Sequence, residues 1–569
     1  MAIATLLLVA LTLAVIAYRS GARASAPLRE MRLDVVLPLD VFPRDVALSP
    51  DGTQIVAARP GHLWLRPLGS EAGHAIAGTE GVNAGLPFWS PDGQSVAFFD
   101  VPSQLKRIDL ATGLIRSLAT APQAVGGSWG STGTILFVPS LASPVIRVGE
   151  AGGATSPATR LATGQQGHRF PQFLPDGRHF VYVAVGTPET RGLYIASLDD
   201  PDNARRLMDT ESGVVVAPPD TLLFMRQGAL MAQRLDVESL RLTGDPEPVA
   251  RQVVAISNQF NALLASASAN GSLVYRRDLG ARQLTWFDRS GRQLEVVGEP
   301  DDGQQAGFNQ SSGRISRDGR RLALQRTVNG NADIWLVDLS RGSQTRLTID
   351  EVRDASAVWS PDGTRLVFGS ERNGVYDMYE KPADGSPSEV LVLASAQHKM
   401  PEDWSSDGGF IVYNSQDARG RDLWALPMTG ERKPIPIATS RFEEWNARFS
   451  PDGRWIAYQS DESGRPQIYL QPFPGPGRRV QVSSTRGVVP RWRQDGRELF
   501  FLGTDDQLMS VSVSLTDATV QVGTPAVLFA VPDGSSFLPS PDGQRFLVST
   551  LIRDPAPLTL LLNWARTRK

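Results

Sequence analysis

The sequence predicts an all-β protein: two six-bladed β-propellers of four-stranded antiparallel blades, preceded by one N-terminal hydrophobic helix. A turn of the type Ser-Pro-Asp-Gly recurs at intervals of about forty residues along the 569-residue chain. Each copy is followed by short stretches that alternate polar and apolar residues and are rich in aromatic and β-branched types, as strands are. Four short strands per repeat correspond to one propeller blade, and no sustained helical periodicity interrupts the series.

The repeated turn has a physical explanation, which residues 450–453 illustrate. Ser450 can cap the turn with its hydroxyl group, and Pro451 presets φ. Asp452 tolerates the third position, and Gly453 can adopt the left-handed conformation that closes a tight hairpin. Each copy therefore predicts a turn between the first two strands of a blade. The copies, some of them degenerate, lie at 49–52, 90–93, 130–133, 174–177, 218–220, 268–271, 316–319, 360–363, 405–408, 450–453, 493–496 and 540–543.

Twelve units in one ring would be unusual, and internal matches favour two rings of six. Leu230-Met231 in the fifth unit matches Leu508-Met509 in the eleventh. The sixth and twelfth units end after a third apolar strand, at 284–287 and 558–564. Strand-like segments at 33–38 and 294–298 precede the first and seventh units, and each is expected to supply the missing outer strand of its own half and so remove a free edge. The predicted propellers are residues 31–291 and 292–569.

Residues 1–30 do not fit the repeat pattern. Residues 2–18 are apolar apart from two threonines, and as a helix they would span roughly 25 Å, slightly less than the hydrocarbon core of a membrane. A transmembrane anchor, a cleavable signal peptide and a buried core helix are all compatible with this composition, and the anchor is favoured. Arginines follow the apolar run and none precedes it, which by itself would favour a cytoplasmic body.

Composition excludes several classes of function. The 57 basic and 60 acidic residues give a net charge of −3 and form no basic block, so nucleic-acid binding is not expected. The chain has no cysteine, which excludes disulfides, thiolate metal sites and a cysteine nucleophile.

No catalytic, cofactor-binding or metal-binding residue is predicted, and the sequence does not identify a ligand-binding residue. Gly126-Gly127-Ser128-Trp129-Gly130 matches the nucleophile-elbow pattern of serine hydrolases, but it lies where a strand enters a turn. The five histidines show no metal-ligand spacing, and His168 and His179 are expected at the surface or at strand ends. The recurring aspartates have a capping role that explains them without calcium. Residues 461–465 form an acidic loop, expected to be solvated.

Two sets of residues carry a resemblance to known families. The aromatic-Ser-Pro-Asp-Gly turn with the strand after it resembles the TolB-type propeller repeat of bacterial periplasmic proteins. The longer stretches 447–458, 461–465, 469–475 and 495–501 resemble the propeller region that follows a transmembrane helix in large bacterial serine/threonine protein kinases. The chain has no glycine-rich nucleotide loop, His-Arg-Asp or Asp-Phe-Gly motif, so it lacks the parts needed for phosphoryl transfer. The resemblance implies the sensor half of such a receptor.

The expected function is therefore a non-catalytic sensor or interaction platform, held at the bacterial inner membrane by its N-terminal helix with the propellers in the periplasm. It would bind a protein, peptide or envelope ligand through the propeller faces, without a cofactor. A component of a TolB-like envelope translocation machine is a variant of this hypothesis. The alternative from another class is a propeller hydrolase or lyase, with its catalytic residues on the blade loops.

Overall fold

The computed structural model describes residues 29–564, apart from 39–44, 60, 83, 101–103, 211, 252, 254, 257–261, 302–312, 329–330, 418–419, 476, 516–518 and 533–534. The predicted N-terminal helix lies outside the described residues. Strands occur throughout the described chain, and the helical element among these residues is the short 3-10 turn η1 (Thr504–Asp506). The all-β prediction is confirmed for the part of the chain that the structure describes.

Among the described residues, no helix is both long enough and apolar enough to cross a membrane.

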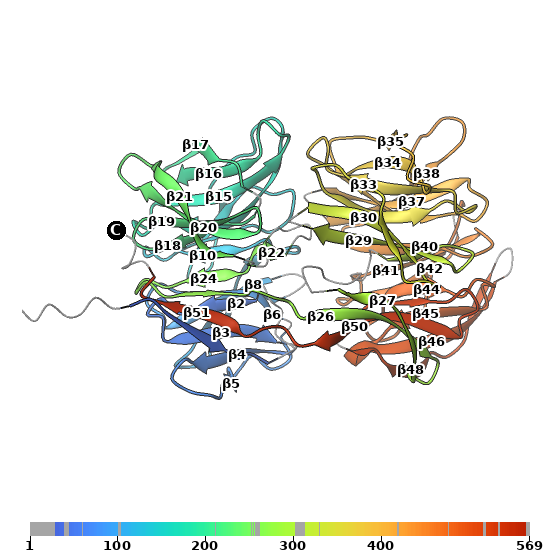
Figure 1. The fold of residues 1–569 in the computed structure, drawn as a ribbon, viewed down its shortest axis with the longest axis horizontal. Helices are drawn as coiled ribbons and strands as arrows, with labels where there is room; N and C mark the ends of the chain where they lie inside the picture. Colours follow the sequence, from blue (N-terminus) through green and yellow to red (C-terminus); the bar gives the residue numbers. More distant parts are fainter. Residues whose placement is uncertain are drawn as a thin grey trace, which may run out of the picture.

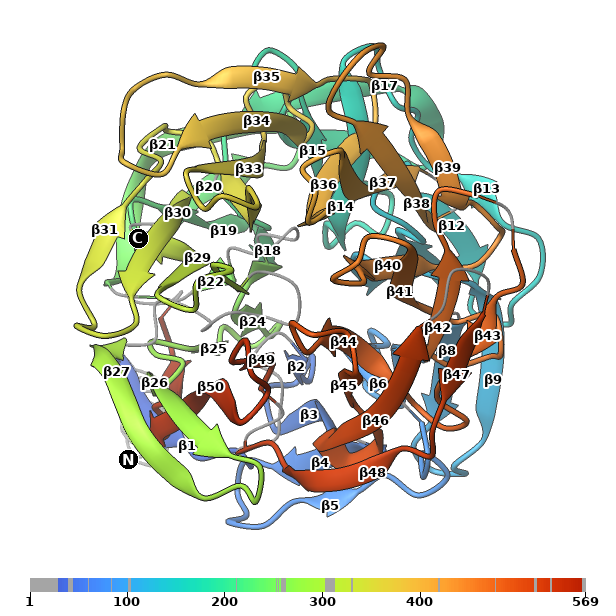
Figure 2. The ribbon, with the colours of Figure 1, turned by 90° about the vertical axis from the view of Figure 1, so that its right-hand side faces the viewer.

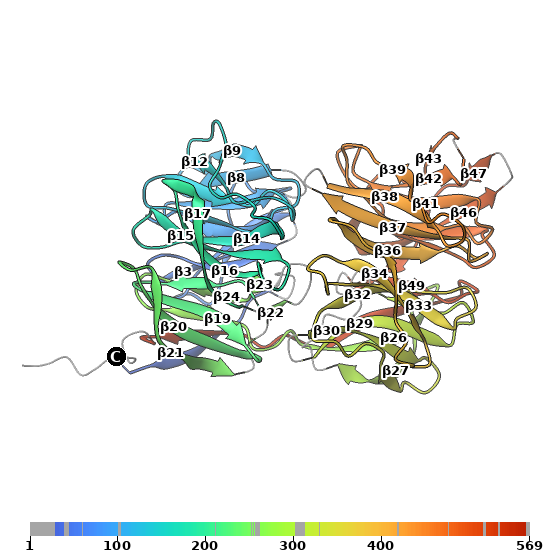
Figure 3. The same cartoon turned by 90° about the horizontal axis from the view of Figure 1, so that it is seen from above.

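The strands form antiparallel sheets arranged around two rings that are stacked face to face, seen edge-on in Figures 1 and 3 and one in front of the other in Figure 2. The first ring contains five sheets built from consecutive strands. These are β2 (Val46–Leu48), β3 (Gln54–Arg59), β4 (His62–Pro67) and β5 (His74–Ala75); β6 (Ala84–Trp89), β7 (Ser95–Asp100), β8 (Gln104–Asp109) and β9 (Ile115–Thr120); β10 (Gly127–Trp129), β11 (Thr134–Phe137), β12 (Ile146–Gly149) and β13 (Ser156–Pro157); β14 (Gln165–Phe173), β15 (His179–Gly186), β16 (Gly192–Ser197) and β17 (Asp200–Met208); and β18 (Val215–Ala217), β19 (Thr221–Arg226), β20 (Ala229–Asp236) and β21 (Arg241–Arg251). A two-stranded sheet, β22 (Ala255–Ile256) with β23 (Ala262–Leu263), follows them.

The second ring also contains five sheets of consecutive strands, which Figure 2 shows radiating from a common centre. These are β28 (Arg314–Ile315), β29 (Arg321–Val328), β30 (Asn331–Asp338) and β31 (Gln344–Arg346); β32 (Asp354–Trp359), β33 (Arg365–Ser370), β34 (Asp377–Pro382) and β35 (Val390–Leu393); β36 (His398–Trp404), β37 (Phe410–Asp417), β38 (Gly420–Pro427) and β39 (Ile435–Ala438); β40 (Glu444–Phe449), β41 (Trp455–Ser460), β42 (Gln467–Pro472) and β43 (Val480–Gln481); and β44 (Val488–Trp492), β45 (Glu498–Leu502), β46 (Gln507–Leu515), β47 (Val520–Val522) and β48 (Ala526–Ala530).

The sheet that completes each ring combines strands from distant parts of the chain. In the first ring the order from the centre outward is β24 (Ala265–Ala267), β25 (Leu273–Tyr275), β51 (Leu558–Leu562) and β1 (Met31–Val35). In the second ring it is β49 (Phe537–Pro539), β50 (Arg545–Arg553), β26 (Ala281–Asp288) and β27 (Gln293–Asp301). In Figure 1 the red strand β51 lies among the blue and green strands of the first ring, and the green strands β26 and β27 lie beside red strands of the second. The chain therefore crosses between the rings twice.

The two crossings pair with each other. Leu273 lies opposite Leu561 and Tyr275 opposite Thr559, and the same register continues into the second ring, where Ala281 lies opposite Arg553. The segments 273–288 and 545–561 thus form one two-stranded structure that belongs to both rings, and we call it the crossover ribbon. Between the rings, Arg553 Nη1 forms an ion pair of 2.6 Å with Asp278.

The crossover ribbon corrects the predicted closure. The segments 284–287 and 558–564 are third strands, as the sequence indicates, but each completes the sheet of the other ring. The strand-like segments near residues 33 and 294 do form the outer strands, each paired with an exchanged strand. The predicted boundary between 291 and 292 therefore does not separate two closed units. Alternating apolar residues predict a strand and the face that it buries. They do not predict its neighbour in the sheet, because the two exchanged strands have similar apolar patterns and either could complete either ring.

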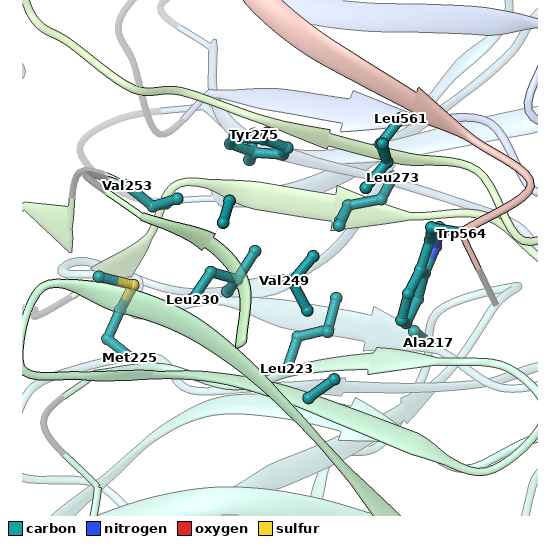
Figure 4. Packing of buried hydrophobic residues seen from close by; sticks show 12 residues of the cluster. Ala217, Leu223, Met225, Leu230, Val249, Val253, Leu273, Tyr275, Leu561 and Trp564 are labelled. Carbon is teal, nitrogen blue, oxygen red and sulfur yellow. The ribbon is translucent and has the colours of Figure 1, made fainter. Parts of the chain in front are cut away.

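The crossover also buries the end of the described chain in the first ring. Leu561 and Trp564 lie in a core cluster with Ala217, Leu223 and Leu273, and Trp564 is only 2% exposed (Figure 4). Burying a side chain of this size contributes on the order of 2–3 kcal/mol by area. The stability of the first ring therefore depends on residues at the far end of the sequence.

The repeated turns adopt the predicted geometry, as residues 360–363 show. Ser360 Oγ donates to Asp362 Oδ1 at 2.6 Å, and the same Oγ accepts the N–H of Arg365 at 2.9 Å. Asp362 Oδ1 also accepts the N–H of Thr364 at 3.0 Å, and Gly363 has a φ of 69°. These bonds, the serine hydroxyl first among them, lower the pKa of Asp362 to about 2. The prediction that the aspartates cap turns is confirmed at this site.

The rings contact each other through the face opposite the turns. Gln123, which precedes β10, donates to Glu443 Oε2 at 2.6 Å, and Gln416 at the end of β37 donates to Gln123. Arg169 of β14 is 4% exposed, and its pKa is lowered to about 10 by burial, against the opposing effect of Glu371 in the second ring. Because the inner strands begin at this interface and end at the turns, the turn faces lie on the two outer sides of the molecule.

Candidate functional site

One position in each blade distinguishes the two rings. It is the residue two places before the first residue of the turn, on or beside the innermost strand. In the first ring this position is uncharged in every unit, with Ala47, Phe88, Ser128, Gln172, Val216 and Ser266. In the second ring it carries four charged residues and two apolar ones, namely Arg314, Val358, Asp403, Arg448, Arg491 and Leu538. The charged residues of the second ring therefore form a layer that the first ring lacks.

The three arginines of this layer, which we call the axial arginines, come from different blades and are buried. Arg314 is 9% exposed, Arg448 5% and Arg491 6%. Arg314 donates to the backbone carbonyl of Glu402 through Nε at 3.2 Å and Nη2 at 2.9 Å, and Arg448 Nη1 donates to the same carbonyl at 2.8 Å. Arg491 Nη1 donates to the carbonyl of Pro490 at 2.9 Å. Arg314 and Arg448, which come from the first and fourth complete blades of the ring, therefore meet on one carbonyl.

Electrostatic repulsion accompanies this burial. Burial lowers the pKa of Arg314 well below its ordinary value, and the positive charge of Arg448 lowers it further. The pKa of Arg491 is likewise well below its ordinary value, first because of burial and then because of Arg448 and Arg314. Burial raises the pKa of Asp403, and the nearby Arg448 and Arg314 oppose that shift. The layer is thus a site where buried positive charge is concentrated.

The two carboxylates beside the axial arginines already have structural roles. Glu402 Oε1 accepts the N–H of Asn446 at 3.0 Å and the side-chain amide of Asn414 at 2.7 Å, and Oε2 accepts the N–H of Ala447. Asp403 Oδ2 accepts the N–H of Phe449 at 2.9 Å. Both carboxylates therefore join the third complete blade of the ring to the fourth.

The bond made by Asp403 is a recurring feature of the layer. In the first ring, Ser128 Oγ accepts the N–H of Phe173 at 3.1 Å, and Ser266 Oγ accepts the N–H of Leu48 at 3.0 Å. In each case the side chain of the layer position accepts from the next blade around the ring. A guanidinium group has no acceptor, so the axial arginines cannot make this bond.

A cavity reaches the layer from the outer side of the second ring. Its volume is about 180 Å³, and Arg314 and Asp403 contribute to its lining. Trp359, Trp404 and Phe449 supply aromatic walls, and the lining continues to the Pro361 and Pro451 positions of the turns. Trp359 is fixed by its indole N–H, which donates to the carbonyl of Arg314 at 2.9 Å. The site is therefore a small aromatic pocket with charged groups at its base.

A larger cavity of about 410 Å³ lies beside the mixed sheet of the first ring. Arg32, Arg251 and Arg277 contribute to its lining. Their environment differs from that of the axial arginines, because the side chains of Arg32 and Arg277 are 53% and 48% exposed and Arg277 lies 3.7 Å from Asp34. The pocket of the second ring is the better candidate because its charged groups are buried.

The residues singled out from the sequence are dispersed. Ser128 lies on β10 with its hydroxyl in the inter-blade bond, so the nucleophile-elbow match is a strand position, as predicted. His179 begins β15 and contacts Asp176 at 2.6 Å. His168, expected at the surface or a strand end, is instead completely buried within β14, and burial lowers its pKa to about 3. Thr159 Oγ1, 2.7 Å from its Nδ1, and Gln165 Oε1, 3.1 Å from its Nε2, are the polar partners that make this burial possible.

The acidic loop at 461–465 has a structural role in addition to its exposed residues. Asp461 Oδ1 accepts the N–H of Glu443, the residue that contacts Gln123 of the first ring. Among the described residues, no group of three or more histidine, aspartate and glutamate side chains could hold a metal ion.

The axial arginines were not identified from the sequence, although the signal was present. The turns define an alignment of the twelve units, and comparing the position two residues before each turn reveals arginine three times in one ring. The recurring turn is the most obvious feature of each repeat, and the position that distinguishes the two rings lies two residues before it and varies between repeats. The information about the site lies in the differences between the repeats.

Comparison with known proteins matches one segment of the second ring to a propeller family. Residues 302–435, which include β28 to β38, match the family model described as the TolB beta propeller domain. A TolB structure from Agrobacterium tumefaciens is similar at 16% identity and a TM-score of 0.37, covering 49% of this chain and 99% of that one. TolB from Acinetobacter baumannii is similar at 12% identity and a TM-score of 0.32, covering 61% and 80%. The tricorn protease is similar at 11% identity and a TM-score of 0.29, covering 85% and 63%.

Proposed function

We propose that this chain is a non-catalytic protein-interaction platform built from two six-bladed TolB-like propellers. The observation that carries the proposal is the pocket of the second ring, which opens on the outer turn face and is lined by the buried axial arginine Arg314. The match of residues 302–435 to the TolB propeller domain supports it, because this segment supplies part of the pocket. In this proposal the first ring and the crossover ribbon hold the second ring rigidly, and the partner binds the outer face of the second ring.

Attachment to the bacterial inner membrane through residues 1–30, with both rings in the periplasm, belongs to the same proposal. So does a role as the sensor part of a receptor-type serine/threonine kinase system. The apolar composition of residues 2–18 and the resemblance of the repeat stretches support these assignments. Protease treatment of spheroplasts should digest the rings while cytoplasmic markers survive. Full protection of the rings, with a periplasmic control protein digested, would rule out this location.

The platform itself can be tested by site-specific photo-crosslinking in the source bacterium. Gln494 lines the mouth of the pocket, and a crosslinker placed there should capture one defined partner protein. The matched control is Thr53, an exposed residue on the turn side of the first ring. The expected result is a discrete adduct from position 494 that is absent from position 53. The same set of adducts from positions 494 and 53, or no adduct from position 494, would refute the proposal.

A further inference from the structure

The donors of Arg448 are only partly used. Its Nη1 donates to the carbonyls of Glu402 and Ala447, whereas its Nε and Nη2 are buried without a hydrogen-bond partner among the described residues. Leaving a buried charged donor unsatisfied is costly, and the cost is greater than for a neutral group. An arginine with two spare donors, 5% exposed, is therefore suited to a ligand that brings acceptors.

The positive charge of the axial arginines indicates that the group accepting their hydrogen bonds is an anion. The layer and its neighbour Glu402 together bring three guanidinium groups and two carboxylates to the axis, and the carboxylates are engaged by backbone and amide N–H groups. An incoming anion would relieve the repulsion between the neighbouring arginines, which adds to the effect of burial in lowering the pKa of Arg314 and Arg491. A planar carboxylate matches the paired donors of a guanidinium group, and hydrogen bonds between charged partners are the strongest of this class.

The dimensions and walls of the pocket restrict the ligand further. About 180 Å³ accommodates a single side chain or chain end, and it is too small for a folded element. Trp359, Trp404 and Phe449 provide apolar surface for the methylene groups next to a carboxylate. Arg448 is not part of this lining but adjoins it, because it shares the Glu402 carbonyl with Arg314 and precedes Phe449 in the chain, and both of these residues line the pocket.

We propose that the pocket of the second ring binds a carboxylate group of a partner polypeptide, with Arg448 Nε and Nη2 as the donors. The inference rests on the proposed platform function and specifies the chemistry that the partner brings. The first ring provides an internal contrast, since its corresponding positions carry no charged residue. One ring would thus recognise the partner while the other serves a structural role.

The test is calorimetric titration of the purified full chain with three blocked peptides. Acetyl-Ala-Glu-Ala-amide offers a side-chain carboxylate, acetyl-Ala-Gln-Ala with a free carboxyl end offers a terminal one, and acetyl-Ala-Gln-Ala-amide offers neither. At least one acidic peptide should bind tenfold or more tightly than the neutral one, and the preferred acidic peptide identifies the source of the carboxylate. Equal affinity for all three peptides, or binding of none, would overturn the proposal.

Variants locate the site. Arg448→Gln should lower the affinity for the acidic peptide at least tenfold. The matched control is Arg320→Gln, which changes an exposed arginine outside the pocket and should leave this affinity unchanged. If Arg448→Gln does not fold, Ser406→Trp takes its place, because Ser406 lines the pocket and a larger side chain there should block entry with the same loss. Unchanged affinity in a folded Arg448→Gln or Ser406→Trp chain would refute the assignment.

The two proposals fail separately. A crosslinked partner at position 494 together with no peptide binding would leave the platform intact and refute the carboxylate chemistry. Carboxylate binding without any partner adduct would support the pocket and refute the platform.

Discussion

Leu273 and Leu561 lie directly opposite each other on β25 and β51, although the whole second ring separates them in sequence. Both side chains are completely buried, and both belong to the core cluster of the first ring. This pair, with the register that continues from it to Ala281 and Arg553, makes closure of each ring depend on the other. The two rings are therefore expected to behave as one cooperative unit.

Removal of β51 should destabilise the first ring. A chain ending at Pro557 loses the third strand of the mixed sheet and exposes the edges of β1 and β25. Hydrogen exchange should then show loss of protection in β1, β24 and β25, far from the deletion in sequence. A chain ending at Trp564 is the control and should retain protection. Normal protection of β25 in the shorter chain would contradict the exchange of strands.

A substitution that creates a cavity in the crossover ribbon should lower the stability of the protein strongly. Leu561→Ala is expected to lower the free energy of unfolding by about 2–5 kcal/mol, because the side chain is fully buried. Leu114→Ala is the matched control, and since Leu114 is 62% exposed it should change stability by no more than about 0.5 kcal/mol. Urea unfolding followed by tryptophan fluorescence measures both. Equal effects of the two changes would argue against a close-packed ribbon.

Acid sensitivity should arise at the turns. The pKa of Asp362 is lowered to about 2 by its hydrogen bonds from Ser360 and Thr364, so its ionised form stabilises the folded state. That contribution is present above the ordinary pKa of 3.8 and is lost as the pH falls toward 2. Asp362→Asn should cost roughly 0.5–1.5 kcal/mol at pH 7 and reduce the loss of stability between pH 4 and pH 2. Identical acid unfolding curves for the two proteins would refute this role.

The contribution of Asp354 to stability should have the opposite pH dependence to that of Asp362. Burial raises the pKa of Asp354 to about 7, against the opposing effects of the nearby Ser370 and Thr348 side chains. The folded state therefore binds this proton more tightly than the unfolded chain, and stability falls as the pH rises from about 4 to about 7. Asp354→Asn should be more stable than the parent at pH 8, on the order of 1–3 kcal/mol, with the difference disappearing near pH 4. A variant that is less stable than the parent at pH 8 would show that the charge is needed.

Much of the fold is predictable because the turn is local chemistry. Ser360, Asp362 and Gly363 specify their hairpin through bonds within six residues, so the turns and the strands that flank them could be assigned from sequence. The sequence could not predict which ring the strands containing Leu284 and Leu560 would join, because each strand has the same alternation of apolar and polar residues and could pair in either ring. Burial of His168 also escaped prediction, because one of its two polar partners, Thr159, lies outside the strand.

The site was predictable only in part. Its walls follow from the aromatic residues that precede several of the turns, as Trp359 and Trp404 illustrate. The meeting of Arg314 and Arg448 on one carbonyl depends on ring closure, which brings blades that are distant in sequence to a common axis. The arginines are visible in the sequence, but their convergence requires the ring.

The crossover ribbon also dictates the order in which the chain can mature during synthesis. The first ring is translated almost completely before residue 275, yet its closing strand begins at Leu558. At about 5–20 residues per second, β25 waits on the order of tens of seconds for its partner. During that interval its open edge can pair with β51 of another copy, and the result would be a strand-exchanged dimer. Slow synthesis and high expression should therefore increase the yield of such dimers relative to the monomer.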